Sequence, residues 1–191
     1  MGTPGLFGFR VNGQDKITHA YGDGYPSGLG VQMMDFIQAC GSVDVMRTLA
    51  ESITLTDGQD PDLFSAPCGD LQWLCNKGKM VDNSSYMTNN IIHSAYIIDL
   101  DECMFTVYSQ VGNRTAHMYL GTYRVRGLPV TYMQPLTRIL SMTPEEAHEV
   151  MERLGTITNQ IEVLTLSHYD LTCGEGSGMT QMFNDSMAGD G

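Results

Sequence analysis

A strand–turn–strand segment near the N-terminus, residues 5–21, constrains the fold more than any other feature. Residues 5–12 (GLFGFRVN) and 16–21 (KITHAY) are rich in apolar, β-branched and aromatic residues, as strands are. Asn12-Gly13 is the pair that a tight hairpin turn prefers, because both of its central positions need a positive φ. The sequence therefore predicts that the chain begins with an antiparallel hairpin.

Helical spacing follows this hairpin. Apolar residues recur every three residues at Val31, Met34, Ile37 and Cys40. Ser27 is placed to cap this helix, Gly41 to end it and Ser42 to begin a second helix. A short helix that ends at Gly78 is expected farther along the chain, after a loop at 55–69.

A second hairpin is predicted from strands at 96–100 and 104–108, which an acidic turn joins. Two carboxylates of this turn, Asp99 and Asp101, leave a metal site as the alternative to a solvated hairpin tip. One more strand is expected at 122–125.

A long amphipathic helix is expected after residue 142. Thr143 and Glu146 form a capping box, and Pro144 fits the first helical turn. Its apolar stripe comprises Ala147, Val150, Met151, Leu154, Ile157, Ile161 and Leu164. Gly155 lies inside the helix, which indicates close packing against a neighbour.

The order of these elements predicts an α+β domain, in which helices pack on an antiparallel sheet built from hairpins. The expected domain spans residues 1–172, and the Gly-, Ser- and Met-rich residues 173–191 are expected to form a tail or docking arm.

Charge and composition exclude several classes of protein. The formal net charge is -12, which repels phosphate backbones and argues against nucleic-acid binding, although a few arginines could still hold a small anion. No apolar run reaches the roughly 20 residues that a membrane span needs, and no signal peptide is evident. The five cysteines lack metal-binding spacing, so we expect free thiols in the cytoplasm, with no metal and no cofactor.

The segment HAYGDGYPSGLG, residues 19–30, is the candidate functional loop. Its glycines allow close backbone approach, and the amides of Ser27 and Gly28 at a helix start favour an anion. Tyr21 and Tyr25 offer rings for stacking and hydroxyl groups for donation. The alternative is a glycine-rich turn followed by a capped helix.

Arginines supply the second indication of a ligand site. Arg10, Arg124 and Arg126 lie on or beside predicted strands, where each needs an acidic or phosphate partner. An internal ion pair, for instance between Arg10 and Asp23, is the alternative. The predicted ligand-binding residues are Arg10, Tyr21, Asp23, Tyr25, Ser27, Gly28, Arg124 and Arg126.

The stretch GFRVNGQDKITHAYGDGYPSGLG resembles a motif of an uncharacterised family of small phage and bacterial proteins. The matching residues are Gly8, Phe9, Arg10, Asn12, Gly13, Asp15, Lys16, Asp23, Tyr25, Pro26, Ser27 and Gly28. The resemblance implies a host-directed role in a bacterial cell, such as binding a nucleotide-derived defence signal.

A second resemblance, at the level of fold, is to the N-terminal-nucleophile hydrolases, which also open with a hairpin, an aspartate-bearing corner and helices. Those enzymes need Cys, Ser or Thr at the mature N-terminus. Removal of Met1 would expose Gly2 rather than Thr3, so this chain departs from their pattern.

Three functions therefore stand as expectations. The first is sequestration of a small polar or phosphate-bearing ligand without turnover, and the second is hydrolysis of that ligand with His19 or Asp23 as base, or amide hydrolysis after processing. The third is a non-catalytic protein that forms a homo-oligomer.

Overall fold

The computed structural model describes residues 3–58, 63, 69–88, 92–109 and 130–157. They belong to one unit of the chain, which spans residues 1–110 and 125–157. The strand expected at 122–125 and the domain boundary expected after residue 172 lie outside the described residues.

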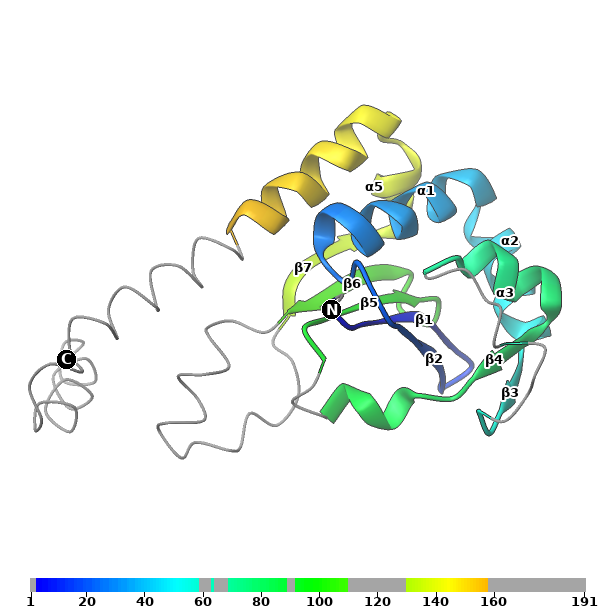
Figure 1. The fold of residues 1–191 in the computed structure, drawn as a ribbon. Coiled ribbons are helices and arrows are strands. Elements are labelled where there is room, and N and C mark those ends of the chain that lie inside the picture. Colours follow the sequence, from blue (N-terminus) through cyan, green and yellow to red (C-terminus); the bar gives the residue numbers. More distant parts are fainter. Residues whose placement is uncertain (1–2, 59–62, 64–68, 89–91, 110–129, 158–191) are drawn as a thin grey trace, which may run out of the picture. The chain divides into compact units, whose positions relative to one another are not determined.

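A five-stranded sheet in the order β2-β1-β5-β6-β7 forms the centre of the molecule (Figure 1). Its strands are β1 (Gly5–Val11), β2 (Gln14–Ala20), β5 (Ser94–Asp99), β6 (Met104–Ser109) and β7 (Val130–Pro135). The predicted α+β class is confirmed, but the prediction of a purely antiparallel sheet is wrong, because β1 and β5 pair in parallel. Parallel neighbours arise here because the long connection between the two hairpins returns the chain to the end of the sheet where β1 begins.

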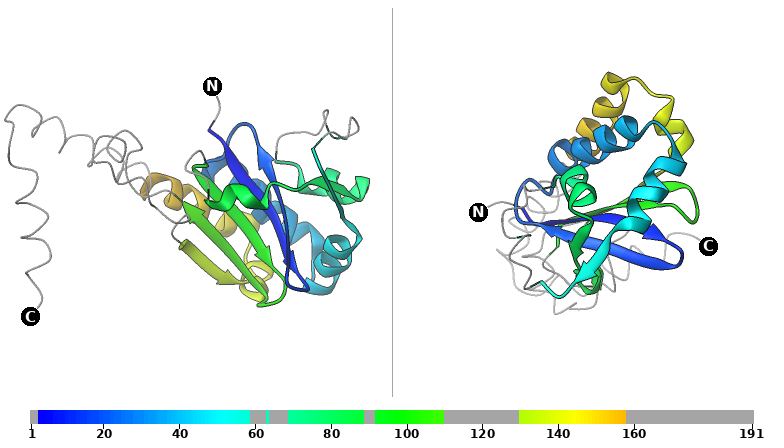
Figure 2. Two further views of the ribbon diagram at one scale, coloured as in Figure 1. Left: turned by 90° about the horizontal axis from the view of Figure 1, so that it is seen from below. Right: turned by 90° about the vertical axis from the view of Figure 1, so that its right-hand side faces the viewer.

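Helices cover one face of this sheet (Figures 1 and 2). They are α1 (Val31–Cys40), α2 (Val43–Ser52), α5 (Leu136–Leu140) and a helix over residues 144–157. Beneath them the core contains Phe7, Phe9, Tyr96, Ile98, Phe105 and Val107 from alternate positions of the strands. Alternation places these side chains on one face, as the strand period of two requires.

The opposite face carries a second, smaller apolar cluster of Leu6, Ile17, Ile92, Ala95 and Ile97. The short 3-10 helix η3 (Ser84–Thr88) lies beneath this face in Figure 1 and contributes Met87 to it. The sheet is therefore buried on both faces near β1.

A small parallel sheet and a short helix flank the hairpin. They are β3 (Thr54–Thr56), β4 (Lys79–Val81) and α3 (Leu71–Lys77), which ends at Gly78 as predicted. After β4, Asn83 donates its N–H to the Ile17 carbonyl at 2.8 Å and accepts the His19 N–H at 3.2 Å. These contacts occupy part of the outer edge of β2, which limits pairing with other chains.

The predicted turn between β1 and β2 is confirmed, since Asn12 and Gly13 have φ of 54° and 70°. The carboxylate of Asp101 accepts the N–H groups of both residues, each at 2.8 Å. The acidic tip of the second hairpin thus caps the turn of the first. Within the described part of the chain, no group of three or more metal-ligating side chains is found there or elsewhere.

Other local predictions are also confirmed. Gly41 ends α1 with φ of 70°, and the Ser42 hydroxyl accepts the Val45 N–H at 3.2 Å. Thr143 and Glu146 form the expected capping box, with contacts of 2.9 and 3.2 Å.

Candidate functional site

The corner predicted as a ligand loop joins β2 to α1 through a π-helical turn, η1 (Pro26–Gly30). Its two tyrosines are accessible: Tyr21 is 83% exposed and Tyr25 is 43% exposed. Asp23 adopts a positive φ of 51°. The corner therefore presents aromatic rings to solvent.

Three backbone donors of this corner, those of Gly28, Leu29 and Gly30, are used within the turn. Gly28 N–H donates to the Tyr25 carbonyl at 3.0 Å, and Leu29 N–H donates to the Asp23 carbonyl at 2.8 Å. Gly30 N–H also donates to Tyr25, at 3.3 Å. These amides satisfy the first turn of the helical segment and do not form an open anion site.

Ser27 does not cap α1, contrary to the sequence-based prediction. It lies inside the π-helical turn, while Gly30 occupies the N-cap of α1 without a side-chain hydrogen bond. The close packing predicted at Gly155 is not found, because a Cβ at that residue would lie 3.8 Å from the Ser27 hydroxyl, an ordinary van der Waals contact.

Gly24 is required by packing of the chain against itself. Its N–H donates to the Thr3 carbonyl at 2.9 Å, and an added Cβ would lie 2.7 Å from the Gly5 nitrogen. The buried Tyr96 hydroxyl donates to the Gly24 carbonyl at 3.0 Å. The corner is thus fixed against the start of β1.

Arg10 is not part of this corner. Gly5 pairs with Ala20 at the corner end of the hairpin, whereas Arg10 pairs with Asp15 about 17 Å farther along the strand. Its guanidinium contacts Asp15 at 2.7 and 3.1 Å, and this hydrogen-bonded partner raises the pKa of Arg10 above its usual range. The ion-pair alternative is therefore found with Asp15 rather than with Asp23, and Asp99 lies 3.5 Å away as a second partner.

The other predicted arginines, Arg124 and Arg126, lie outside the described residues. The structure therefore brings together Tyr21, Asp23, Tyr25, Ser27 and Gly28 along one connection, and it separates Arg10 from them.

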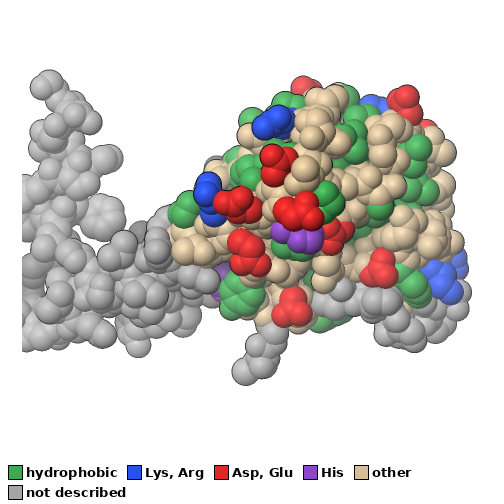
Figure 3. All heavy atoms as spheres, turned by 90° about the horizontal axis from the view of Figure 1, so that it is seen from above, with side chains coloured by type: hydrophobic (Ala, Val, Ile, Leu, Met, Phe, Trp, Pro, Cys, Tyr) green, Lys and Arg blue, Asp and Glu red, His purple; other side chains and the backbone are tan. Residues whose placement is uncertain are grey.

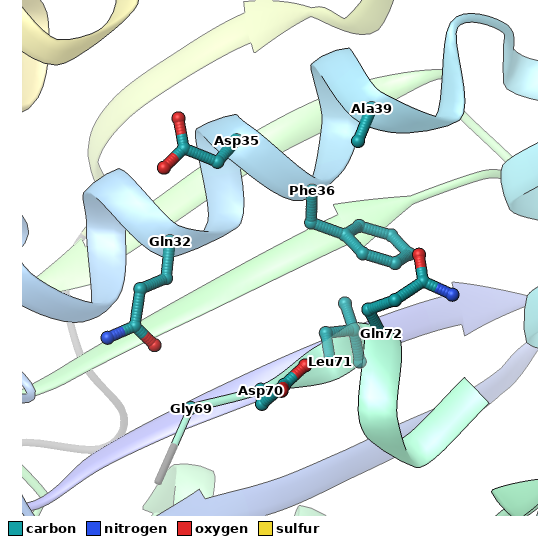
Figure 4. A pocket seen from close by; sticks show the side chains of 8 residues that line it. All are labelled: Gln32, Asp35, Phe36, Ala39, Gly69, Asp70, Leu71 and Gln72. Carbon is teal, nitrogen blue, oxygen red and sulfur yellow. The ribbon is translucent and has the colours of Figure 1, made fainter. Parts of the chain in front are cut away.

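A cavity of about 460 Å³ lies between α1 and the start of α3 (Figure 4). Its lining residues are Gln32, Asp35, Phe36, Ala39, Gly69, Asp70, Leu71 and Gln72. The corner leads directly into α1 and so positions the first wall of this cavity.

The second wall depends on a glycine and a helix cap. Gly69 has φ of 79°, and a Cβ there would lie 2.3 Å from the Gln32 side-chain oxygen. Asp70 then accepts the Trp73 N–H at 2.8 Å and begins α3. The two walls therefore approach closely at Gly69.

Acceptors dominate the polar lining of the cavity. Asp35 and Asp70 contribute carboxylates, and the Gln72 amide donates to Asn76 at 3.1 Å, which leaves its oxygen available as an acceptor. Phe36 supplies an apolar surface and is held edge-on against Phe9, with ring centroids 5.8 Å apart. This combination suits a small ligand that donates hydrogen bonds and carries positive charge.

The rim of the cavity is acidic. Asp35 is half-exposed and contacts His148 Nε2 at 2.6 Å across to the 144–157 helix. Figure 3 shows acidic side chains gathered around a histidine on the helical face of the molecule. The surface charge would attract a cationic ligand toward this opening.

Sequence reasoning missed the cavity because its polar residues have ordinary local roles. Gln32 and Asp35 are three residues apart on the polar side of α1, which usually indicates a solvated helix face. Asp70 caps α3, and this role does not by itself indicate a binding site. These residues line one cavity only because α1 lies beside the start of α3 in the folded protein.

The cysteine thiols that the structure describes offer no activated nucleophile in the core. Cys40, Cys75 and Cys103 are free, as expected. Burial raises the pKa of Cys40 to about 11 and that of Cys75 to about 12, so both stay protonated at neutral pH.

In the segments that the structure describes, no helix has the length and apolar character to cross a membrane. No protein-family model, curated protein or solved structure was found to match the chain.

Proposed function

We propose that this protein binds a small organic cation in the cavity between α1 and α3 and retains it without chemical conversion. The observation that carries the proposal is that Asp35, Asp70 and the Phe36 ring all line one cavity (Figure 4). Carboxylates make charge-assisted hydrogen bonds to ammonium and guanidinium groups, and the ring packs against their carbon chain.

The lining favours binding over catalysis. Its described side chains are carboxylates, carboxamides and apolar groups, and no Ser, Thr, Cys or His is among them. Covalent catalysis needs a nucleophile with a base in hydrogen-bond reach. Retention of ligand therefore accounts for the lining with fewer assumptions than hydrolysis.

The sign of the ligand charge differs from the sequence-based expectation. A phosphate-bearing ligand needs cations, yet Arg10 is already paired with Asp15. Phosphate binding would depend on Arg124 and Arg126, which the structure does not describe. The described groups support a cation instead.

Agmatine is a suitable probe because it carries a guanidinium, an ammonium and a short carbon chain. Calorimetric titration of the full chain is expected to show binding of agmatine and no binding of AMP. The variant Asp35→Asn keeps the size of the side chain, removes its charge and is expected to weaken agmatine binding about tenfold or more.

The matched control is Asp44→Asn, which removes an exposed carboxylate from the first turn of α2, outside the cavity lining. It is expected to leave agmatine binding nearly unchanged. Equal binding by Asp35→Asn and the original chain would refute the cavity as the site, and tight AMP binding would restore the anion hypothesis. Mass spectrometry of molecules released by heating would then identify the natural ligand.

A further inference from the structure

Three aromatic side chains gather on the face of the sheet opposite α1. His19, near the end of β2, has its ring 4.5 Å from that of Tyr21, at an interplanar angle of 83°. Tyr86, from η3, lies 6.2 Å from the same His19 ring, at 80°. Both tyrosines therefore stand nearly perpendicular to one histidine ring.

This cluster is separate from the α1–α3 cavity. His19 pairs directly with Leu6, and paired residues of neighbouring strands place their side chains on the same face. Leu6 belongs to the smaller apolar cluster, whereas α1 packs on the larger one. The two sites therefore lie on opposite faces of the sheet.

The tyrosines are too exposed to serve as core residues. Tyr21 is 83% exposed and Tyr86 is 41% exposed. The Trp73 ring, by contrast, already contacts a cation, because Lys77 Nζ lies 5.2 Å from its centroid. No such cation–ring contact is found at Tyr21 or Tyr86 within the described residues.

We propose that His19, Tyr21 and Tyr86 form an aromatic cage for an alkylammonium cation. The two tyrosine rings stand at right angles to the His19 ring, as the walls of an aromatic cage do, and such cages bind quaternary ammonium groups. The net charge of -12 attracts cations over anions, and Asp23 lies two residues after Tyr21.

The local environment of His19 supports this role. Burial lowers the pKa of His19 below its usual value of 6.5, so the ring is neutral at pH 7 and does not repel a cation. The His19 backbone is held in place, because its N–H donates to the Asn83 side-chain oxygen at 3.2 Å. Asn83 is followed by η3, which carries Tyr86, so one connection positions two members of the cage.

Choline and its neutral isostere 3,3-dimethylbutan-1-ol test the proposal directly. They have the same shape, and only choline is charged. Ring-proton chemical shifts of the full chain are expected to move with choline, with an affinity about tenfold or more above that for the isostere. Equal affinity for the two molecules would overturn the cage, since it would indicate simple apolar contact.

Variants locate the site. Tyr21→Ala is expected to lower choline affinity severalfold and Tyr21→Phe to retain most of it, because the ring face is kept. Tyr25→Ala removes a neighbouring tyrosine and is expected to have little effect. The cage is refuted if Tyr21→Ala binds choline as well as the original chain does.

A separate variant distinguishes this site from the proposed cavity. Asp35→Asn is expected to leave choline binding unchanged while it weakens agmatine binding. Loss of choline binding in Asp35→Asn would place the cation in the cavity and overturn the cage, without bearing against the cavity proposal.

Discussion

The Lys16 ammonium donates to the Ile53 carbonyl at 2.6 Å, which ties the edge strand β2 to the end of α2. The same ammonium donates to the carbonyls of Ala50 and Glu51, at 2.9 and 3.3 Å. Lys16 is only 7% exposed, and it donates to carbonyls at the end of a helix, where intrahelical N–H partners run out. This lysine from the Asn12-Gly13 hairpin therefore fixes the position of α2 on the sheet.

Replacement of Lys16 by Met is expected to lower the free energy of unfolding by about 3 kcal/mol, because it leaves buried carbonyls without a charged donor. Urea denaturation followed by circular dichroism measures the change. Lys77→Met is the control, since Lys77 lies in the last turn of α3 over the Trp73 ring. Equal losses in the two variants would show that Lys16 has no special role as a helix cap.

Gly8 and Gly155 are expected to respond to alanine in opposite directions. Gly8 has φ of 151°, and a Cβ there would lie 2.0 Å from the Lys16 carbonyl oxygen. Gly8→Ala is therefore expected to cost about 3 kcal/mol or more by forcing β1 away from β2. A Cβ at Gly155 meets only ordinary contacts of 3.8 Å or more, so Gly155→Ala is expected to stabilise the helix by about 0.5–1 kcal/mol. Thermal unfolding of both variants tests this contrast, which fails if Gly8→Ala is tolerated.

Local features of the fold were predictable from sequence because their causes are local. The Asn12-Gly13 turn, the Ser42 cap and the Gly78 helix end each depend on residues within a few positions. The parallel pairing of β1 with β5 was not predictable, because those strands are separated by more than 70 residues and no short-range signal specifies their register.

The candidate site likewise has some features that the sequence predicts and others that it does not. Exposure of Tyr21 follows from its place at the end of a strand, and the Arg10–Asp15 pair follows from the hairpin register that the Asn12-Gly13 turn sets. The cavity depends on the contact of α1 with α3. The sequence predicts each of these helices separately and does not predict that they lie side by side. A tertiary contact of this kind has no signature in either helix alone.

The Asp101 carboxylate predicts a specific acid sensitivity. Backbone N–H donation by Gly13 and Asn12 and the nearby Arg47 lower its pKa below the usual 3.8. Unfolding restores the usual pKa, so the carboxylate stabilises the fold above about pH 3.8 and this contribution is lost as the pH falls through the lower folded value. Asp101→Asn is expected to reduce stability at pH 6 and to flatten its decline below pH 4. Urea midpoints measured from pH 2.5 to 6 test this, and parallel pH curves for the two chains would contradict it.

His148 is predicted to restrain the cavity through its 2.6 Å contact with Asp35. A cationic ligand must compete with this imidazole for the carboxylate, so His148→Ala is expected to tighten agmatine binding severalfold. Arg153→Ala is the matched control, because Arg153 lies on the same helix and pairs with Glu149 at 2.8 Å instead of with Asp35. Calorimetric titration of both variants separates local competition from a general change in surface charge. Equal tightening in the two variants would assign the effect to the overall field, and weaker binding in His148→Ala would show that the histidine helps to hold Asp35 in its binding position.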